Sequence, residues 1–309
     1  MPTVMELLFR NLHQCCEIDL PTKPLQSDDD EDGEISLCTL AAINWGNIKT
    51  PADFEKPALI AVRALDALLD YQEYPVGAAE RSTMNRRPLG VGIINFAASA
   101  DLAVEKGACP KNSETKYGQG TTPHMTYKSD VDELVAPKDR LDWPGLVYQL
   151  QETGIRNSTL MALMPSETSS QISNATNGIE PPRSFVSIKQ SKDGILKQVV
   201  PEYRRLKNKY ELLWDQKSPE GYLKIMAVLQ KYIDQGISVN TSYNPQHYEE
   251  EKIPLSEMLR HLVMFYKYGG KQLYYFNTYD GATDEMEPPA HSYEGQPLPD
   301  EEDCESCKI

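Results

Sequence analysis

Three stretches of the chain repeat apolar residues at helical spacing, which predicts that each folds as an amphipathic helix. The first covers residues 57–72, the second 221–236 and the third 256–270. The third ends at Gly269 and Gly270, and glycine commonly follows the last turn of a helix. The positions expected to face the core in the first two are Leu59, Val62, Leu65, Leu69, Tyr222, Met226, Leu229 and Ile233.

Short apolar runs between these helices predict buried strands. One covers residues 90–97, another covers 158–164, and a third covers 271–278. A polar, Lys- and Thr-rich stretch from Lys111 to Lys128 is expected to lie on the surface. Strands that alternate with helices indicate an α/β fold with largely parallel strand pairing.

The composition narrows the class of protein. The chain has 309 residues, and its 40% apolar content allows a substantial core. No apolar run reaches the length of a membrane span, and the N-terminus lacks the features of a signal peptide. We therefore expect a cytoplasmic protein with no membrane partner and six reduced cysteines. The net charge of −15 argues against nucleic-acid binding, which needs a basic surface.

A hydroxyl-rich helix start follows the second of these strands. Pro165 can open a turn, and Ser166, Thr168 and Ser169 are residues that favour the first turn of a helix. They can simply cap that helix. Alternatively, the free N–H groups and positive dipole of the helix start can bind an anion. The segment by itself favours capping.

The composition changes at residue 280. Residues 280–309 hold ten acids, one lysine and four prolines, which predicts a disordered tail. Near its end, Cys304 and Cys307 have the spacing of an exchange-competent dithiol. A structural zinc site would need four ligands, and the preceding chain supplies no nearby second cysteine pair. We therefore expect no metal site and a thiol pair that reacts with another site.

Six segments together resemble the C-terminal half of the large, catalytic subunit of class I ribonucleotide reductase. The resemblance runs from about Cys15 to Ile309, and the segment that begins at Pro165 is the most specific. Between "INFAASADL" and "EKGACP" the family carries an additional helix and loop that this chain lacks. The matching segments are "CCEIDLPTKPL", "GEISLCTLAAINWG", "PSETSSQISNATNGIEPPR", "SKDGILKQVVPEY", "QLYYFNT" and "CESCKI".

The resemblance implies the second half of a ten-stranded α/β barrel with a central finger loop. It divides the chain into an N-terminal extension over residues 1–14, a half-barrel with the finger loop over 15–279, and a flexible redox tail over 280–309. A half-barrel alone would leave strand edges uncovered. We therefore expect a separate chain to supply the N-terminal half, with one redox cysteine and the nucleotide specificity site.

The resemblance also implies roles for the cysteines. Cys15 would carry the thiyl radical, because in the family one residue separates this cysteine from a glutamate, here Glu17. Glu17 would be the general base on the 3′-hydroxyl of the substrate. Cys38 would belong to the dithiol that supplies two electrons, with its partner cysteine in the other half. Cys16 is interpreted as a packing residue and Cys109 as a structural one.

Substrate binding is expected at two places. The family usually has an asparagine two residues before the radical cysteine, where this chain has His13. Either the histidine replaces that amide, or Asn11 reaches the site from a shifted register. The resemblance also favours the anion-binding interpretation of the helix start, and so assigns the substrate phosphate to Ser166, Glu167, Thr168 and Ser169.

Electron transfer is expected to involve two further pairs. Tyr274 and Tyr275 resemble the radical-transfer pair of the family, although tyrosines in strands are common packing residues. Neighbours in an ideal strand point to opposite faces, so a stacked pair needs a local distortion. Cys304 and Cys307 would reduce the active-site disulfide and be reduced in turn by thioredoxin or glutaredoxin.

The expected function is thus the reduction of ribonucleoside diphosphates, with no cofactor bound by this chain. A small subunit with a dinuclear metal centre and a tyrosyl radical would supply the radical. The alternative is a non-catalytic regulatory or assembly remnant of the same family, which His13 and the lost helix favour. A stand-alone dithiol oxidoreductase is a weaker hypothesis, because "CESCKI" does not lie at a helix start.

Overall fold

The computed structural model describes residues 10–12, 17–27, 30–92, 96–136, 141–191 and 194–281. The strands in these ranges are β1 (Arg10–Leu12), β2 (Asp19–Pro21), β3 (Thr39–Ala41), β4 (Leu89–Val91), β5 (Val186–Ser191), β6 (Gly194–Val199), β7 (Thr241–Tyr243) and β8 (Phe276–Thr278). The helices are α2 (Glu55–Tyr71), α3 (Gly77–Arg86), α4 (Phe96–Lys106), α5 (Pro123–Thr126), α6 (Trp143–Thr153), α7 (Glu167–Ile172), α8 (Tyr203–Leu206), α9 (Glu220–Gln230) and α10 (Leu255–Lys267).

The strands form four pairs, of which β3–β4 and β7–β8 are parallel. An extended segment, residues 159–163, connects these two parallel pairs through main-chain hydrogen bonds and is called the middle strand below. On one side, the Leu89 N–H donates to the carbonyl of Thr159 at 3.0 Å. On the other side, Leu163 forms a parallel bridge with Ile237, shortly before β7.

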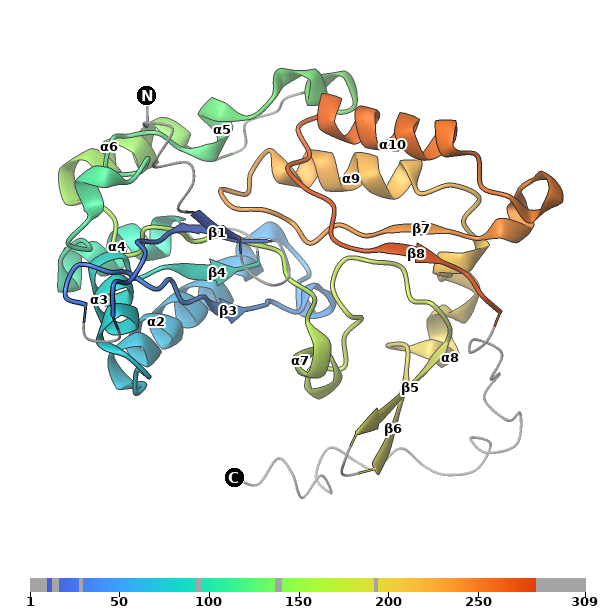
Figure 1. Cartoon of the computed structure of the whole chain (residues 1–309), viewed down its shortest axis with the longest axis horizontal. Coiled ribbons are helices and arrows are strands. Elements are labelled where there is room, and N and C mark those ends of the chain that lie inside the picture. Colours follow the sequence, from blue (N-terminus) through green and yellow to red (C-terminus); the bar gives the residue numbers. More distant parts are fainter. Residues whose placement is uncertain are drawn as a thin grey trace.

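Five extended segments of the described chain are therefore hydrogen-bonded in the order in which they occur in the sequence. Helices lie between successive segments, with α2, α3, α4 and α6 at one end of the molecule and α9 and α10 at the other (Figure 1). This order agrees with the predicted α/β fold and parallel pairing. The antiparallel hairpin β5–β6 projects away from this body, below α8 (Figure 1).

The amphipathic patterns correctly predicted the helices that cover these segments. In α2, Val62, Leu65 and Leu69 are buried, as expected. In α9, Met226 is buried, whereas Ile233 is buried in the turn after the helix. The third helix, α10, ends at Lys267, and Gly269 adopts a left-handed backbone conformation with φ +90°.

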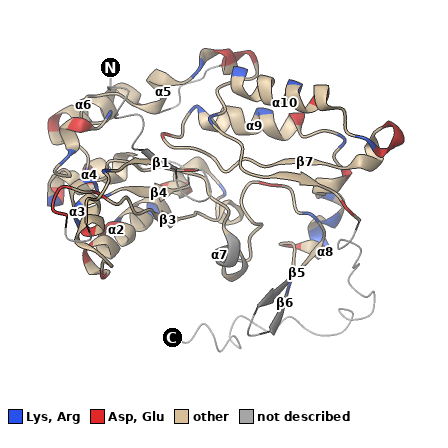
Figure 2. Cartoon of the chain, viewed as in Figure 1, with Lys and Arg blue, Asp and Glu red and all other residues tan. Residues whose placement is uncertain are grey.

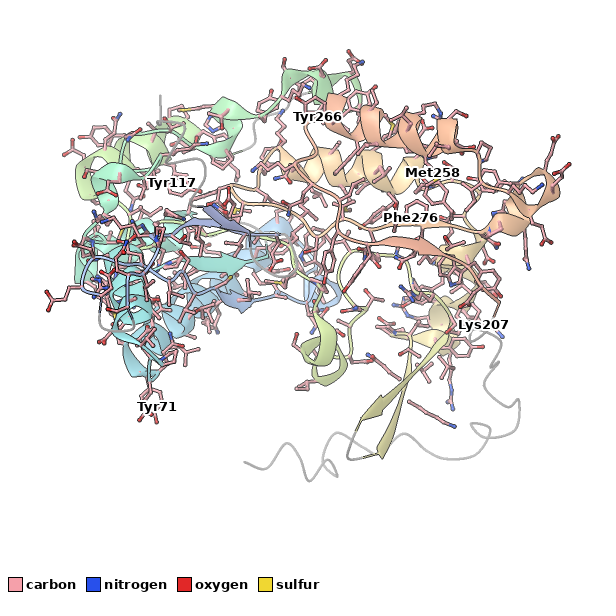
Figure 3. All side chains as sticks on the ribbon, in the orientation of Figure 1. Tyr71, Tyr117, Lys207, Met258, Tyr266 and Phe276 are labelled. Carbon is pink, nitrogen blue, oxygen red and sulfur yellow. The ribbon has the colours of Figure 1, made fainter. Side chains whose placement is uncertain are left out.

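Two predictions from local patterns were wrong in part. The strand expected over residues 90–97 extends too far, because β4 ends at Val91 and Phe96 already begins α4. The run from Val91 to Ala100 is mostly apolar, so its pattern does not mark where a buried strand gives way to a buried helix. The stretch from Lys111 to Lys128 is not purely superficial, because Tyr117 packs in the core at 3% exposure (labelled in Figure 3).

A buried ionic network holds α2 against the residues that come just before β4 and just before the segment at residues 159–163. The Arg87 side chain donates to Asp66 at 2.6 Å and to Asp70 at 2.8 Å. Asp66 also accepts from the amide of Asn157 at 3.2 Å. Arg87 ends α3 with φ 48°, which turns the chain directly into β4. The network therefore fixes where β4 and the segment beside it begin.

Surface charge is distributed unevenly over the elements. Acidic residues Glu249, Glu250 and Glu251 occupy a turn between β7 and α10, whereas Arg204 and Arg205 make α8 basic (Figure 2). Within the described ranges, no helix combines the length and the apolar character needed to cross a membrane.

Candidate active site

Glu17 is fully buried, close to where the segment at residues 235–238 meets the middle strand. Its carbonyl oxygen accepts a hydrogen bond from the Gly236 N–H at 2.6 Å. Its side-chain oxygen Oε2 accepts from the Ser238 hydroxyl at 3.3 Å. Leu163 pairs with the same segment, because the Ser238 N–H donates to the Leu163 carbonyl at 2.9 Å. The predicted general base is thus held at the centre of the five segments.

Gly236 allows this close approach because it lacks a side chain. A Cβ atom at this position would lie 2.3 Å from Nε2 of Gln272 and 3.1 Å from the carbonyl oxygen of Glu17. Both separations are shorter than ordinary van der Waals contact. A larger residue at position 236 would therefore push the predicted base away from the sheet.

Cys38 lies one residue before β3 and packs beside the same part of the sheet. It contacts a small buried cluster of Ile18, Leu20 and Ala162, and it is half-buried itself. Ile18 follows Glu17 directly in the sequence, so the structure brings the predicted base and the predicted redox cysteine to one region. The catalytic role of Cys38 stays a prediction.

Several predicted site residues lie outside the described residues. These are His13, Cys15, Cys16, Cys304 and Cys307.

Cys109 is buried at 2% exposure. Its main-chain N–H donates to Ile155 at 3.0 Å, and burial raises the pKa of its thiol to about 11. Such a thiol is protonated and poorly nucleophilic at neutral pH, in agreement with a structural role.

The hydroxyl-rich segment forms the first turn of α7, as its sequence predicts. The Ser169 N–H donates to the Ser166 carbonyl at 3.0 Å, and the Ser169 hydroxyl donates to the same oxygen. The Ser169 side chain is exposed, whereas Ser170 is buried. The first turn of a helix presents N–H groups that an anion can accept from. This geometry is compatible with capping and with phosphate binding, so the phosphate role stays a prediction for Ser166, Glu167, Thr168 and Ser169.

Tyr274 and Tyr275 form a close pair. Their ring centroids are 3.9 Å apart with an angle of 40° between the ring planes, and the Tyr274 hydroxyl donates to that of Tyr275 at 2.9 Å. Tyr275 is 56% exposed. Phenols in contact can exchange an electron and a proton over a short distance, which is what a radical-transfer pair requires.

The strand predicted over residues 271–278 is shorter than expected, since β8 begins at Phe276. Regular pairing starts only at Phe276 (labelled in Figure 3), whose ring stacks on that of Tyr243 with 5.1 Å between centroids. The distortion that two neighbouring rings need in order to meet is therefore present at Tyr274 and Tyr275.

Sequence reasoning missed the polar residues that support these groups. Ser238 and Asn240 alternate with Ile237 and Val239 in a mostly buried run. Their place inside an apolar strand pattern is the signal that could have found them, because polar groups buried in a strand need hydrogen-bond partners. No cluster of residues suited to a metal ion occurs in the part of the chain that the structure describes.

The sequence also matches a known protein family. The sequence model described as "Ribonucleotide reductase, barrel domain" matches residues 13–99 and 95–276. The chain belongs to this family. The two matched ranges overlap at residues 95–99, shortly before the position where the resemblance predicts a lost helix and loop.

Curated relatives support the same family. The chain is 52% identical to the ribonucleoside-diphosphate reductase subunit alpha of Haemophilus influenzae, over 90% of this chain and 41% of the relative. It is 48% identical to ribonucleoside-diphosphate reductase 1 subunit alpha of Escherichia coli, over 97% of this chain and 43% of the relative. The subunit alpha of Enterobacteria phage T4 is 39% identical over the same shares. The chain thus spans about two fifths of the length of these ribonucleotide reductase subunits.

Proposed function

We propose that this chain is the C-terminal catalytic part of an aerobic ribonucleoside-diphosphate reductase. The observation that carries the proposal is the hydroxyl contact of 2.9 Å between Tyr274 and Tyr275 in a chain of the ribonucleotide reductase barrel family. A chain that had lost the chemistry would have no need to keep two phenols in contact through a distorted strand.

The proposed chemistry distributes roles over the residues described above. Cys15, as a thiyl radical, abstracts the 3′ hydrogen of the ribose, and Glu17 accepts the proton of the 3′-hydroxyl. The 2′-hydroxyl takes a proton from the thiol pair and leaves as water, and Cys38 and a second thiol supply two electrons and the second proton as they form a disulfide. Cys15 then returns the hydrogen atom to C3′ and is again a thiyl radical. The start of α7 binds the substrate phosphates, and Cys304 with Cys307 reduces the disulfide again.

The five hydrogen-bonded segments support the proposal that this chain forms half of a ten-stranded barrel around a finger loop. The chain spans only 41–43% of the length of two relatives, which leaves room in them for the remaining strands and the second redox cysteine. We propose that a separate chain supplies them. The further partners are a small subunit that generates the radical at a dinuclear metal centre, and thioredoxin or glutaredoxin as reductant.

Reconstitution tests this proposal. The chain is mixed with the N-terminal part of the large subunit and with the small subunit, and formation of deoxyribonucleoside diphosphate is measured. Turnover is expected for the complete mixture and for no mixture that lacks a component. Activity without the N-terminal part would show that the division of roles is wrong. Full activity of a mixture that lacks this chain would favour a regulatory or assembly remnant.

A further inference from the structure

The main-chain amides of the tyrosine pair have an unusual pair of acceptors. In a regular strand, successive N–H groups point to opposite sides, so only every second one faces a given neighbouring strand. Here the Tyr274 N–H donates to the Val239 carbonyl at 2.7 Å, and the Tyr275 N–H donates to the side-chain Oδ1 of Asn240 at 2.9 Å. Both consecutive amides thus face the same neighbouring segment.

The distortion lies in which amide reaches the Val239 carbonyl. In the register of β7 and β8 the Thr241 N–H donates to the Tyr275 carbonyl at 2.9 Å, so a regular parallel ladder would also send the Tyr275 N–H to the Val239 carbonyl. The Tyr274 N–H takes that acceptor instead, so the Tyr275 N–H needs another one. A main-chain N–H left without a protein acceptor weakens the local strand pairing. The Asn240 side chain supplies that acceptor.

The NH₂ group of the Asn240 side chain also has a hydrogen-bond partner. Its Nδ2 donates to a carboxylate oxygen of Glu180. Glu180 lies in the segment that follows α7. This segment passes close to Met164, because a Cβ atom on Gly178 would lie 3.7 Å from the Met164 carbonyl oxygen. Asn240 therefore joins the tyrosine pair to the segment that follows the proposed phosphate-binding helix.

We propose that Asn240 is a positioning residue that holds the rings of Tyr274 and Tyr275 in contact, and that Glu180 orients its amide. The role of the tyrosines in the reaction rests on the proposed function, whereas the hydrogen bonds of Asn240 do not depend on it. An amide is the side chain that fits, because one of its ends accepts from a main-chain N–H while the other donates to a carboxylate.

Amide exchange tests the hydrogen bond between Asn240 and Tyr275 without an activity measurement. Tyrosine-selective ¹⁵N labelling of the full chain allows amide exchange to be followed by NMR. Asn240→Ala is expected to accelerate exchange of the Tyr275 amide by about tenfold or more, whereas the Tyr274 amide, which keeps its Val239 acceptor, changes by less than about twofold. Ser242→Ala is the matched control, because Ser242 lines the same hollow as Glu180 and Asn240. Equal exchange at Tyr275 in wild type and Asn240→Ala would overturn the proposal.

An exchange of partners tests the role of Glu180. Asn240→Asp is expected to act like Asn240→Ala, because two carboxylates would then face each other. The double variant Glu180→Gln/Asn240→Asp places an amide donor opposite a carboxylate that can still accept from the Tyr275 N–H. Amide exchange at Tyr275 should return close to the wild-type rate. A double variant no better than Asn240→Asp would refute the orienting role of Glu180.

Turnover of the assembled enzyme then tests the consequence for the reaction. Asn240→Ala should lower kcat by about tenfold or more and change KM for the ribonucleoside diphosphate by less than about twofold, with recovery in the double variant. Faster amide exchange without any loss of kcat would overturn the positioning role. If Tyr274→Phe and Tyr275→Phe both remain active, the proposed function fails instead, whatever the exchange data show.

Discussion

The Ser238 hydroxyl donates a hydrogen bond to the Glu17 carboxylate across 3.3 Å, although 221 residues separate the two in the sequence. Under the proposed function this bond supports the general base. Glu17→Gln should abolish turnover, because an amide cannot accept the proton. Ser238→Ala should lower kcat about five- to tenfold, since one hydrogen bond to a carboxylate contributes about 1 kcal/mol or somewhat more. Steady-state kinetics of the assembled enzyme checks both, with Ser242→Ala as the control.

Substitution of Tyr274 and Tyr275 tests the proposed radical transfer directly. Tyr274→Phe and Tyr275→Phe should each reduce turnover to background without weakening substrate binding, because phenylalanine is not oxidised at an accessible potential. Stability should change by less than about 0.5 kcal/mol for Tyr275→Phe, since its side chain is largely exposed. Tyr71→Phe, at a position that is 88% exposed at the end of α2 (Figure 3), is the control. A mutant that keeps its activity would return that tyrosine to a packing role.

The register of the proposed thiyl radical is tested by two serine substitutions. Cys15→Ser should abolish reduction and leave assembly with the partner chains intact, because a hydroxyl does not form a comparable radical. Cys16→Ser should be tolerated. Turnover and co-elution of the assembled subunits provide the measurements. The opposite pattern would place the radical on Cys16.

The dithiol near the end of the chain is expected to relay electrons only. Cys304→Ser/Cys307→Ser should complete one turnover for each pre-reduced active site and then stop when thioredoxin or glutaredoxin is the reductant. Dithiothreitol, which is small enough to enter the site, should restore multiple turnover at least in part. Single-turnover and steady-state assays separate these steps. Continued turnover with thioredoxin would refute the relay, and loss of the first turnover would indicate a structural role.

The ion pairs between α9 and α10 predict a pH-dependent stability. Arg260 and Lys224 hold the pKa of Glu220 at about 2, below its ordinary value of 4.5. A carboxyl whose pKa is lower in the folded state stabilises the fold above its ordinary pKa, and this stabilisation is lost as the pH falls from about 4.5 towards 2. Because Glu220 is partly exposed, we expect Glu220→Gln to cost only about 1 kcal/mol at pH 7.

Urea unfolding at pH 7, 5 and 3.5 measures this effect. The difference between wild type and Glu220→Gln should be constant at the two higher pH values and smaller at pH 3.5. Glu250→Gln is the matched control, because its ion pair with Lys252 is exposed on both sides and should contribute nothing measurable. A difference independent of pH would mean that the glutamate stabilises the helix pair by packing rather than by charge.

Local sequence patterns predicted those parts of the fold whose signal is carried by neighbouring residues. The helical repeat of Val62, Leu65 and Leu69 fixed α2, and the hydroxyl-rich turn fixed the start of α7. Patterns failed where tertiary packing decides. Tyr117 is buried although polar residues surround it in the sequence, because the chain folds back over it.

The candidate site was predicted mainly from the resemblance, and the supporting residues were not predicted at all. The contact between Glu17 and Ser238 depends on strands that meet only in the folded chain. The role of Asn240 depends on a distortion at Tyr275 that strand periodicity does not encode. The types and spacing of the residues pointed to the reacting groups. The residues that support them, Ser238 and Asn240, depend on which segments lie side by side in the folded chain.

The buried apolar cluster runs without interruption from Val62 in α2, through Leu160 and Val239, to Phe265 in α10. Its members come from both ends of the molecule and from the middle strand between them. The helices at the two ends of the molecule therefore share one core and have no separate cores on which to melt independently. Heating should remove both in a single cooperative transition, so that near-ultraviolet circular dichroism and tyrosine amide exchange report the same midpoint.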